Sequence, residues 1–189
     1  MKLITGFGLI AFFWLALWGG FVAFNEYVLK SGTEVLFYIE QRDPRDFFKG
    51  DYVQLQFDIN QIKLPEGTSI SQGAVVYVSL VKNADGCYDS TGISTTRPAG
   101  LFIKGKVTFF INELARLPKR ETVTTGPQGV WVDYGIERFY IRENTGAAIE
   151  KAVREGVAEG KRLKARVMID RWGRPLIKGL ILKSGEISI

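Results

Sequence analysis

The stretch Arg42–Phe57, RDPRDFFKGDYVQLQF, shows how most of the chain is built, because a charged turn leads directly into an alternating strand. Pro44 fixes its own φ and pushes the residue before it into an extended conformation, so the charged start predicts a turn and not a helix. After Lys49-Gly50-Asp51, apolar side chains recur at every second position as far as Phe57. A period of two predicts a strand that is buried on one face and entered through a glycine corner.

The same stretch gathers charges of both signs between rigid turns. The charged side chains that stand closest together are Asp43, Asp46, Asp51, Arg42, Arg45 and Lys49. One interpretation is an ordinary charged turn, in which carboxylates accept hydrogen bonds from nearby amides or pair with the arginines. The other interpretation is a functional site. Both interpretations stand at the level of sequence.

The N-terminal segment is set apart by its lack of charge. Leu3–Phe24 contains 22 uncharged residues, and a helix of that length spans about 33 Å, enough to cross a hydrocarbon core. A cleaved signal peptide is the alternative, but its apolar region is usually only about 7–15 residues long. We therefore predict a transmembrane signal anchor over residues 1–30, followed by one extracytoplasmic domain over residues 31–189.

Charges around this span favour one orientation, and small residues mark one of its faces. Lys2 precedes the span, and this weak positive bias keeps the N-terminus inside and translocates the rest of the chain. Two overlapping small-xxx-small pairs are formed by Ala16, Gly19, Gly20 and Ala23. Such residues are common in membrane helices generally, but they also let a second helix approach closely. The hypothesis is a contact face for another membrane subunit.

Composition narrows the chemistry. The chain has 25 Lys and Arg against 20 Asp and Glu, with no dense basic run, so nucleic acid is not expected as a partner and nearby anionic lipid explains the mild excess. It has no histidine, which removes Ser-His-Asp and Cys-His catalysis and every histidine-ligated metal site. Its single cysteine, Cys87, excludes an intrachain disulfide. We predict no metal, no cofactor and no catalytic residue.

The remaining sequence predicts a mainly β domain. Alternating or β-branched segments predict about seven strands. They cover residues 34–40, 52–59, 74–82, 101–111, 130–141 (as one strand or two), 162–170 and 175–183. Gly105 interrupts one of them and predicts a bulge or a close backbone approach. Residues 147–159 form the one helix predicted outside the membrane. The economical architecture is a small antiparallel sandwich or barrel with that helix packed on it.

Three blocks of the sequence carry a family resemblance. Gly50–Phe57, GDYVQLQF, resembles the motif after which the GDYXXLXY family of bacterial membrane-anchored proteins is named, and 43–46, DPRD, fits that family's lead-in. Residues 134–140 and 167–180 resemble two later blocks in the same order. The resemblance therefore covers the chain from Val35 nearly to its end.

One position departs from the motif. Phe57 stands where the family name has tyrosine. In the predicted strand it shares a face with Val53 and Leu55, so a ring without a hydroxyl predicts a role in packing there and not in chemistry.

The resemblance implies a membrane complex, because members of the family are encoded beside multi-pass membrane proteins, and it supplies no catalytic residues. The residues expected to matter are therefore those beside the glycine corners of the first two blocks: Asp43, Arg45, Asp46, Gly50, Asp51, Tyr52, Gly135 and Glu137. We further expect the Glu137 carboxylate to approach Arg45 or Lys49.

Three functions fit these observations. The first is a non-enzymatic accessory or assembly subunit of the bacterial inner membrane, single-pass, with its domain in the periplasm and a multi-pass membrane protein and the lipid bilayer as partners. The second is a signal-peptidase-like hydrolase using Ser31 with Lys104 or Lys106, although the Ser-x-Met motif of that family is absent. The third is a binding module for an envelope sugar or peptide, with Trp131, Tyr134 and Tyr140 as its rings.

Overall fold

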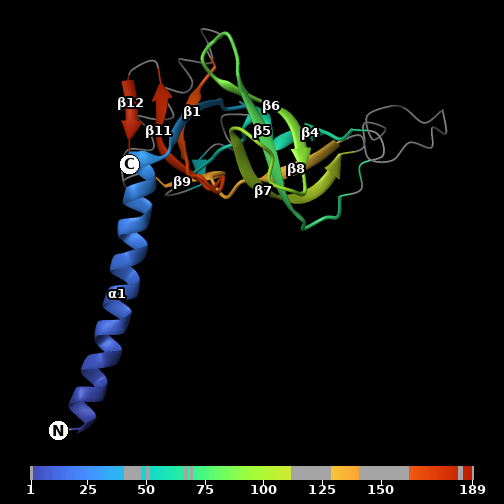
Figure 1. Ribbon diagram of the computed structural model, residues 1–189. Helices are drawn as coiled ribbons and strands as arrows, with labels where there is room; N and C mark the ends of the chain where they lie inside the picture. The colour runs from blue at the N-terminus through green and yellow to red at the C-terminus, as the bar shows by residue number, and fades with distance from the viewer. Residues whose placement is uncertain are drawn as a thin grey trace, which may run out of the picture.

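A computed structural model of the chain describes residues 2–40, 48–49, 52–65, 68, 70–111, 129–140, 162–182 and 185–188. Over these residues a long helix, α1 (Lys2–Ser31), projects from a domain built of strands (Figure 1). The helix predicted over 147–159 and the charged residues 41–47 lie outside the described residues. A mainly β domain preceded by one N-terminal apolar helix is the fold that the sequence predicts.

The described strands form three antiparallel sheets. The first sheet has the order β1 (Thr33–Tyr38), β10 (Lys164–Ile169), β11 (Pro175–Leu182), β12 (Gly185–Ser188). The second has the order β2 (Phe48–Lys49), β3 (Tyr52–Gln54), β9 (Arg138–Tyr140). The third has the order β4 (Gln61–Lys63), β8 (Gly129–Asp133), β7 (Phe102–Ile111), β5 (Val75–Lys82), β6 (Tyr88–Ser94).

Some strand boundaries differ from those expected. The strand predicted over 52–59 ends early, and Asp58–Asn60 forms a short 3-10 helix, because the Asn60 side chain takes the Phe57 N–H that a longer strand would give to a neighbour. The segment 130–141 is two strands, β8 and β9, which belong to different sheets. Residues 83–100, which lie outside the predicted strands, contain β6, and this strand pairs with β5.

All three sheets contribute to one hydrophobic core. Its largest fully buried side chains are Phe37, Phe57, Ile39, Leu55, Ile59, Ile103, Ile169, Leu180, Val35, Val76 and Val78. Phe57 is 1% exposed, and its ring meets the ring of Phe37 edge to face at 6.1 Å between centroids. The packing role predicted for the phenylalanine at the last motif position is confirmed.

Backbone contacts at the motif strand join the sheets. An isolated antiparallel bridge links Ile39, which follows β1, to Phe57. The Leu55 N–H donates to the Glu137 carbonyl at 2.8 Å, and the Glu40 N–H donates to the Gln56 carbonyl at 2.7 Å. Residues 55–57 therefore lie between the end of β1 and the start of β9, and any shift there moves both neighbours.

Helix α1 is exposed over residues 7–23 and leaves the domain as a free rod (Figure 1). Its segment Phe7–Ser31 has a mean hydropathy of 2.0, and its most apolar window buries nothing against the domain. This helix is long and apolar enough to cross a membrane. Near its end, Val28 is 3% exposed, so the last helical turns pack on the domain.

Gly105, where the sequence predicts a close backbone approach, generates the first test. A Cβ at this position would lie 2.4 Å from Val132 Cγ1 and 2.9 Å from Tyr134 Cδ1. We expect Gly105→Ala to lower the free energy of unfolding by about 1–3 kcal/mol through overpacking. Chemical denaturation of the detergent-solubilised chain measures this. Gly92→Ala is the matched control, since no neighbour lies within 4 Å of its added Cβ, and equal losses in both variants would contradict the packing argument.

Candidate functional site

The corner between β8 and β9 is closed by the carboxylate of Glu137. Its Oε1 accepts from the Tyr134 N–H at 2.6 Å, and its Oε2 accepts from the Gly135 N–H at 2.8 Å. Gly135 has a φ of +81°, a left-handed conformation in which a side chain would be strained. The chain therefore reverses sharply here, and the acidic side chain satisfies the amides that the reversal leaves unpaired.

Asn60 ties this corner to the motif strand. Its side chain is fully buried, its Oδ1 accepts from the Phe57 N–H at 2.6 Å, and its Nδ2 donates to the Val132 carbonyl at 2.7 Å. Nδ2 also lies 3.2 Å from Glu137 Oε1. One amide therefore links three chain segments. Asn60 was not singled out in the sequence analysis, because the one sign of its role in the sequence is a polar residue next to an apolar run.

Tyr134 belongs to the core and not to a binding surface. It is 6% exposed, and its hydroxyl donates to the Ile59 carbonyl at 2.5 Å. Burial, and then the nearby Glu137 and Asp133 carboxylates, raise the pKa of this phenol well above its usual value. Its ring was grouped with Trp131 and Tyr140 as a candidate ligand contact, and of the three only Trp131 and Tyr140 face the groove described next.

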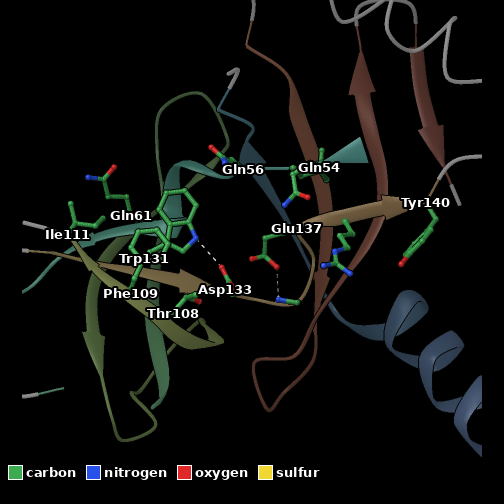
Figure 2. Close-up of a pocket in the computed structure, with 13 residues that line it drawn as sticks. Gln54, Gln56, Gln61, Thr108, Phe109, Ile111, Trp131, Asp133, Glu137 and Tyr140 are labelled. Carbon is green, nitrogen blue, oxygen red and sulfur yellow. Dashed lines mark hydrogen bonds between the residues drawn. The ribbon is translucent and has the colours of Figure 1, made fainter. Parts of the chain in front are cut away.

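A groove of about 740 Å³ opens beside this corner, between the second and third sheets (Figure 2). Its walls come from strands β3, β4, β7, β8 and β9 and the segments that follow them. The lining side chains include Gln54, Gln56, Gln61, Thr108, Phe109, Ile111, Trp131, Asp133, Glu137, Arg138 and Tyr140. A volume in this range suits a small ligand or a few residues of another chain.

One wall of the groove is a row of side chains on neighbouring strands. Trp131 is the register partner of both Phe109 on β7 and Gln61 on β4. The Phe109 and Trp131 rings stack at 5.4 Å with an interplanar angle of 11°. A bulge between Val107 and Phe109 shifts the β7 register and turns Phe109 toward this row. The Trp131 Nε1–H donates to Asp133 Oδ1 at 3.0 Å, which fixes the indole.

The opposite wall comes from the motif strand. Tyr52 and Tyr140 are register partners whose rings lie 5.9 Å apart, and the Arg138 guanidinium lies 5.8 Å from the centre of the Tyr52 ring. Tyr140 is 69% exposed. Period two places Tyr52 and Gln54 on this open face and leaves the buried face to Leu55 and Phe57 after them. Both walls thus combine exposed aromatic rings with amide side chains.

Comparison with known proteins places this architecture in a family. A family model described as GDYXXLXY protein matches residues 14–180, which include most of α1 and the β domain. The chain belongs to the GDYXXLXY family. No curated protein and no solved structure matches it. In this GDYXXLXY protein, the motif residues Leu55 and Phe57 are core residues, 0% and 1% exposed, whereas Tyr52 lies on the groove side.

The residues that the sequence singled out in this GDYXXLXY protein divide into two sets. Tyr52, Gly135 and Glu137 lie at or beside the groove. The other first-block residues lie outside the described residues: Asp43, Arg45, Asp46, Gly50 and Asp51. The expected approach of Glu137 to Arg45 or Lys49 therefore stays a prediction. Within the described ranges, the hydrogen bonds of the Glu137 carboxylate come from backbone amides and Asn60.

The serine considered for hydrolysis lies elsewhere. The Ser31 hydroxyl donates to the Tyr27 carbonyl at 2.7 Å within the last turn of α1. No lysine stands among the described residues that line the cleft around it, and Lys104 and Lys106 are exposed positions on β7. For the described part of the chain, no group of three or more His, Cys, Asp or Glu side chains is arranged to hold a metal ion.

Tyr134 generates a test of the corner. We expect Tyr134→Phe to cost about 1–3 kcal/mol, because the donor to the Ile59 carbonyl is lost inside the core. The unfolded phenol ionises near a pKa of about 10 while the buried one stays protonated, so the free energy of unfolding of the native protein falls as pH rises above that value. Denaturation across alkaline pH should show a shallower fall in Tyr134→Phe. Tyr140→Phe, at an exposed ring, serves as control; an unchanged slope in Tyr134→Phe would refute the assignment.

Proposed function

We propose that this protein is a single-pass, non-enzymatic accessory subunit of a complex in the bacterial inner membrane. Helix α1 stays in the bilayer as a permanent anchor, and the β domain stands in the periplasm. The groove receives an extended segment of a multi-pass membrane partner. The observation that carries the proposal is a groove with exposed aromatic rings on both walls, in a domain that begins where an apolar helix ends.

The packing of α1 supports a retained anchor. Val28 in its last turn is buried against the domain, and the Phe24 ring lies 6.2 Å from the Trp172 ring. Gly32, just after the helix, has no room for a side chain, since a Cβ would lie 2.7 Å from the Val28 carbonyl oxygen and 3.1 Å from that of Ile169. Cleavage within the last turns of α1 would remove side chains that pack on the β domain. A leader peptide that is cleaved off does not contribute to the packing of the mature domain, so these contacts favour a retained helix.

The chemistry of the groove supports a protein partner. Trp, Tyr and Arg dominate the binding energy of interfaces, and this groove offers Trp131, Tyr140 and Arg138. The amides of Gln54 and Gln56 can pair with the backbone of an extended segment, which needs donors and acceptors in alternation. Gln56 Oε1 is shielded from solvent and has no hydrogen-bond partner among the described atoms, so one acceptor of this amide is left unpaired.

The other two candidate functions draw less from the geometry. The Ser31 hydroxyl is committed to a backbone carbonyl in its helix, with no lysine beside it in the described cleft, so a Ser-Lys hydrolase has no geometric support. A free sugar or peptide could use the same rings as a protein segment. Crosslinking from the groove separates a protein partner from a free sugar or peptide, because only a protein partner gives a crosslinked product of one defined protein mass.

A photo-crosslinking amino acid at Tyr140 tests the groove in cells. We expect it to capture a multi-pass membrane protein, because this side chain is 69% exposed at the mouth of the groove. The control is the same label at Lys82, an exposed position at the end of β5 that does not line the groove. Mass spectrometry identifies the product. Capture of the same proteins at both positions, or of none at Tyr140, would contradict the proposal.

The helix face gives a separate test. Ala16, Gly19, Gly20 and Ala23 are exposed on α1, and a Cβ added at Gly20 meets no neighbour within 4 Å in the chain itself. Gly20→Leu should therefore leave the fold intact but separate two packed membrane helices. We expect recovery of the membrane partner in mild detergent to fall about tenfold, as a loss of about 1–2 kcal/mol implies. Phe21→Leu, on the opposite side of the helix, should leave recovery unchanged. The small-residue face has no role if both variants behave like the wild type.

A further inference from the structure

The turn between β10 and β11 packs on α1 at the point where the uncharged part of the helix ends. The Trp172 ring lies 6.2 Å from the ring of Phe24, and the Arg174 guanidinium lies 5.2 Å from the centre of the same ring. Phe24 is the last residue of the uncharged run, and Glu26 is the first charge after it. If α1 spans a bilayer, this turn lies at the level where the hydrocarbon gives way to lipid headgroups.

The domain holds this turn rigidly. Asp170 Oδ1 accepts from the backbone N–H groups of Trp172 and Arg174, both at 2.8 Å. Gly173 has a φ of +82°, and its carbonyl accepts from the Lys104 N–H of β7 at 2.8 Å. The third sheet therefore supports the turn from behind, so the side chains that project from it keep their place at the helix.

The turn presents an exposed indole together with three arginines, of which one lies over the indole ring. The Arg171 guanidinium lies 4.0 Å from the centre of the Trp172 ring, and Arg97 Nη2 donates to the Arg171 carbonyl at 2.7 Å. Trp172 is 44% exposed. None of these arginines, Arg174 included, forms an ion pair with a carboxylate of the described chain.

The acidic groups nearby are already engaged. Glu26 pairs with Lys30 at 3.0 Å, and Glu34 pairs with Arg166 at 2.5 Å and Lys178 at 3.7 Å. Asp170 Oδ1 accepts the two turn amides, and its Oδ2 is shielded from solvent. The Asp170 carboxylate is the one negative charge beside the three guanidinium groups in this part of the described chain, so the surface keeps a net positive charge.

We propose that Arg171–Arg174, together with Arg97, forms a docking surface for the headgroups of anionic phospholipids. Tryptophan prefers the membrane interface, and arginine binds phosphate oxygens through paired donors. A cleft of about 430 Å³ between the turn and the end of α1 has Phe24, Trp172, Asp170 and Arg171 among its lining residues and leaves room for part of a lipid beside the turn. Arg97 and Arg174 stand outside this cleft, on the surface next to it. Bound lipid holds the domain against the bilayer at a set height. This inference rests on the proposed membrane anchor.

The test uses the full chain, purified in mild detergent, with phosphatidylglycerol and phosphatidylcholine offered in equal amounts. Native mass spectrometry measures which lipid is retained. We expect the wild type to prefer phosphatidylglycerol and the double variant Arg171→Gln/Arg174→Gln to lose about thirtyfold in that preference, as loss of two basic contacts implies. The control variant Lys63→Gln/Lys82→Gln removes the same charge from exposed positions on β4 and β5 and should keep the preference for phosphatidylglycerol. Equal preference in the wild type and the arginine variant, or equal loss in both variants, overturns the proposal.

A second measurement reports position and separates the two proposals. The chain is reconstituted in vesicles of phosphatidylcholine alone or of an equimolar mixture with phosphatidylglycerol, some carrying lipids brominated near the headgroup. The emission of Trp172, obtained by difference from Trp172→Phe, should be quenched more in the mixture. A chain that floats with the vesicles but shows equal quenching in both overturns the docking surface alone. A chain that does not float overturns the anchor and the docking surface together.

Discussion

The Asn60 amide is buried where the motif strand, the end of β8 and the corner before β9 meet. The amide oxygen accepts a hydrogen bond from the Phe57 N–H at the end of the motif strand. The amide nitrogen donates to the Val132 carbonyl and to the Glu137 carboxylate. A buried amide is costly unless every group is paired, so this network allows one relative placement of the segments and opposes others. The groove walls stand on these same segments, and their separation follows from that placement.

Core packing and the lining of the groove are therefore divided between the two faces of the same strands. On β3 and its extension the family motif gives Leu55 and Phe57 to the core and Tyr52 to the open face. On β9, Phe139 is buried while Tyr140 is exposed. A strand alternates its side chains whatever their identity, so a short motif can specify a packed interior and a contact surface together. The other end of the domain, at α1, has different side chains: an exposed indole and arginines that form no ion pair with a carboxylate of the described residues.

Much of this organisation could be predicted from local pattern, but two expectations failed. Residue spacing was enough to predict four features: the apolar helix, the β domain, the close backbone approach at Gly105 and the packing role of Phe57. The early end of β3 did not, because the Asn60 side chain takes a bond that strand pairing would use. Tyr134 was expected at a surface with Trp131, but the alternation of β8 continues through Asp133, so its ring shares the buried face of Val130 and Val132.

The sequence by itself determined that an uncharged helix precedes a histidine-free β domain, because length, charge and a period of two are properties of consecutive residues. Tertiary structure alone decided which rings face one another. Tyr52 meets Tyr140, Phe109 meets Trp131, and Phe24 meets Trp172 only after sheet register and hairpin packing bring distant segments together. Register is set by burial of one whole face of each strand, a collective condition that no single stretch of sequence contains.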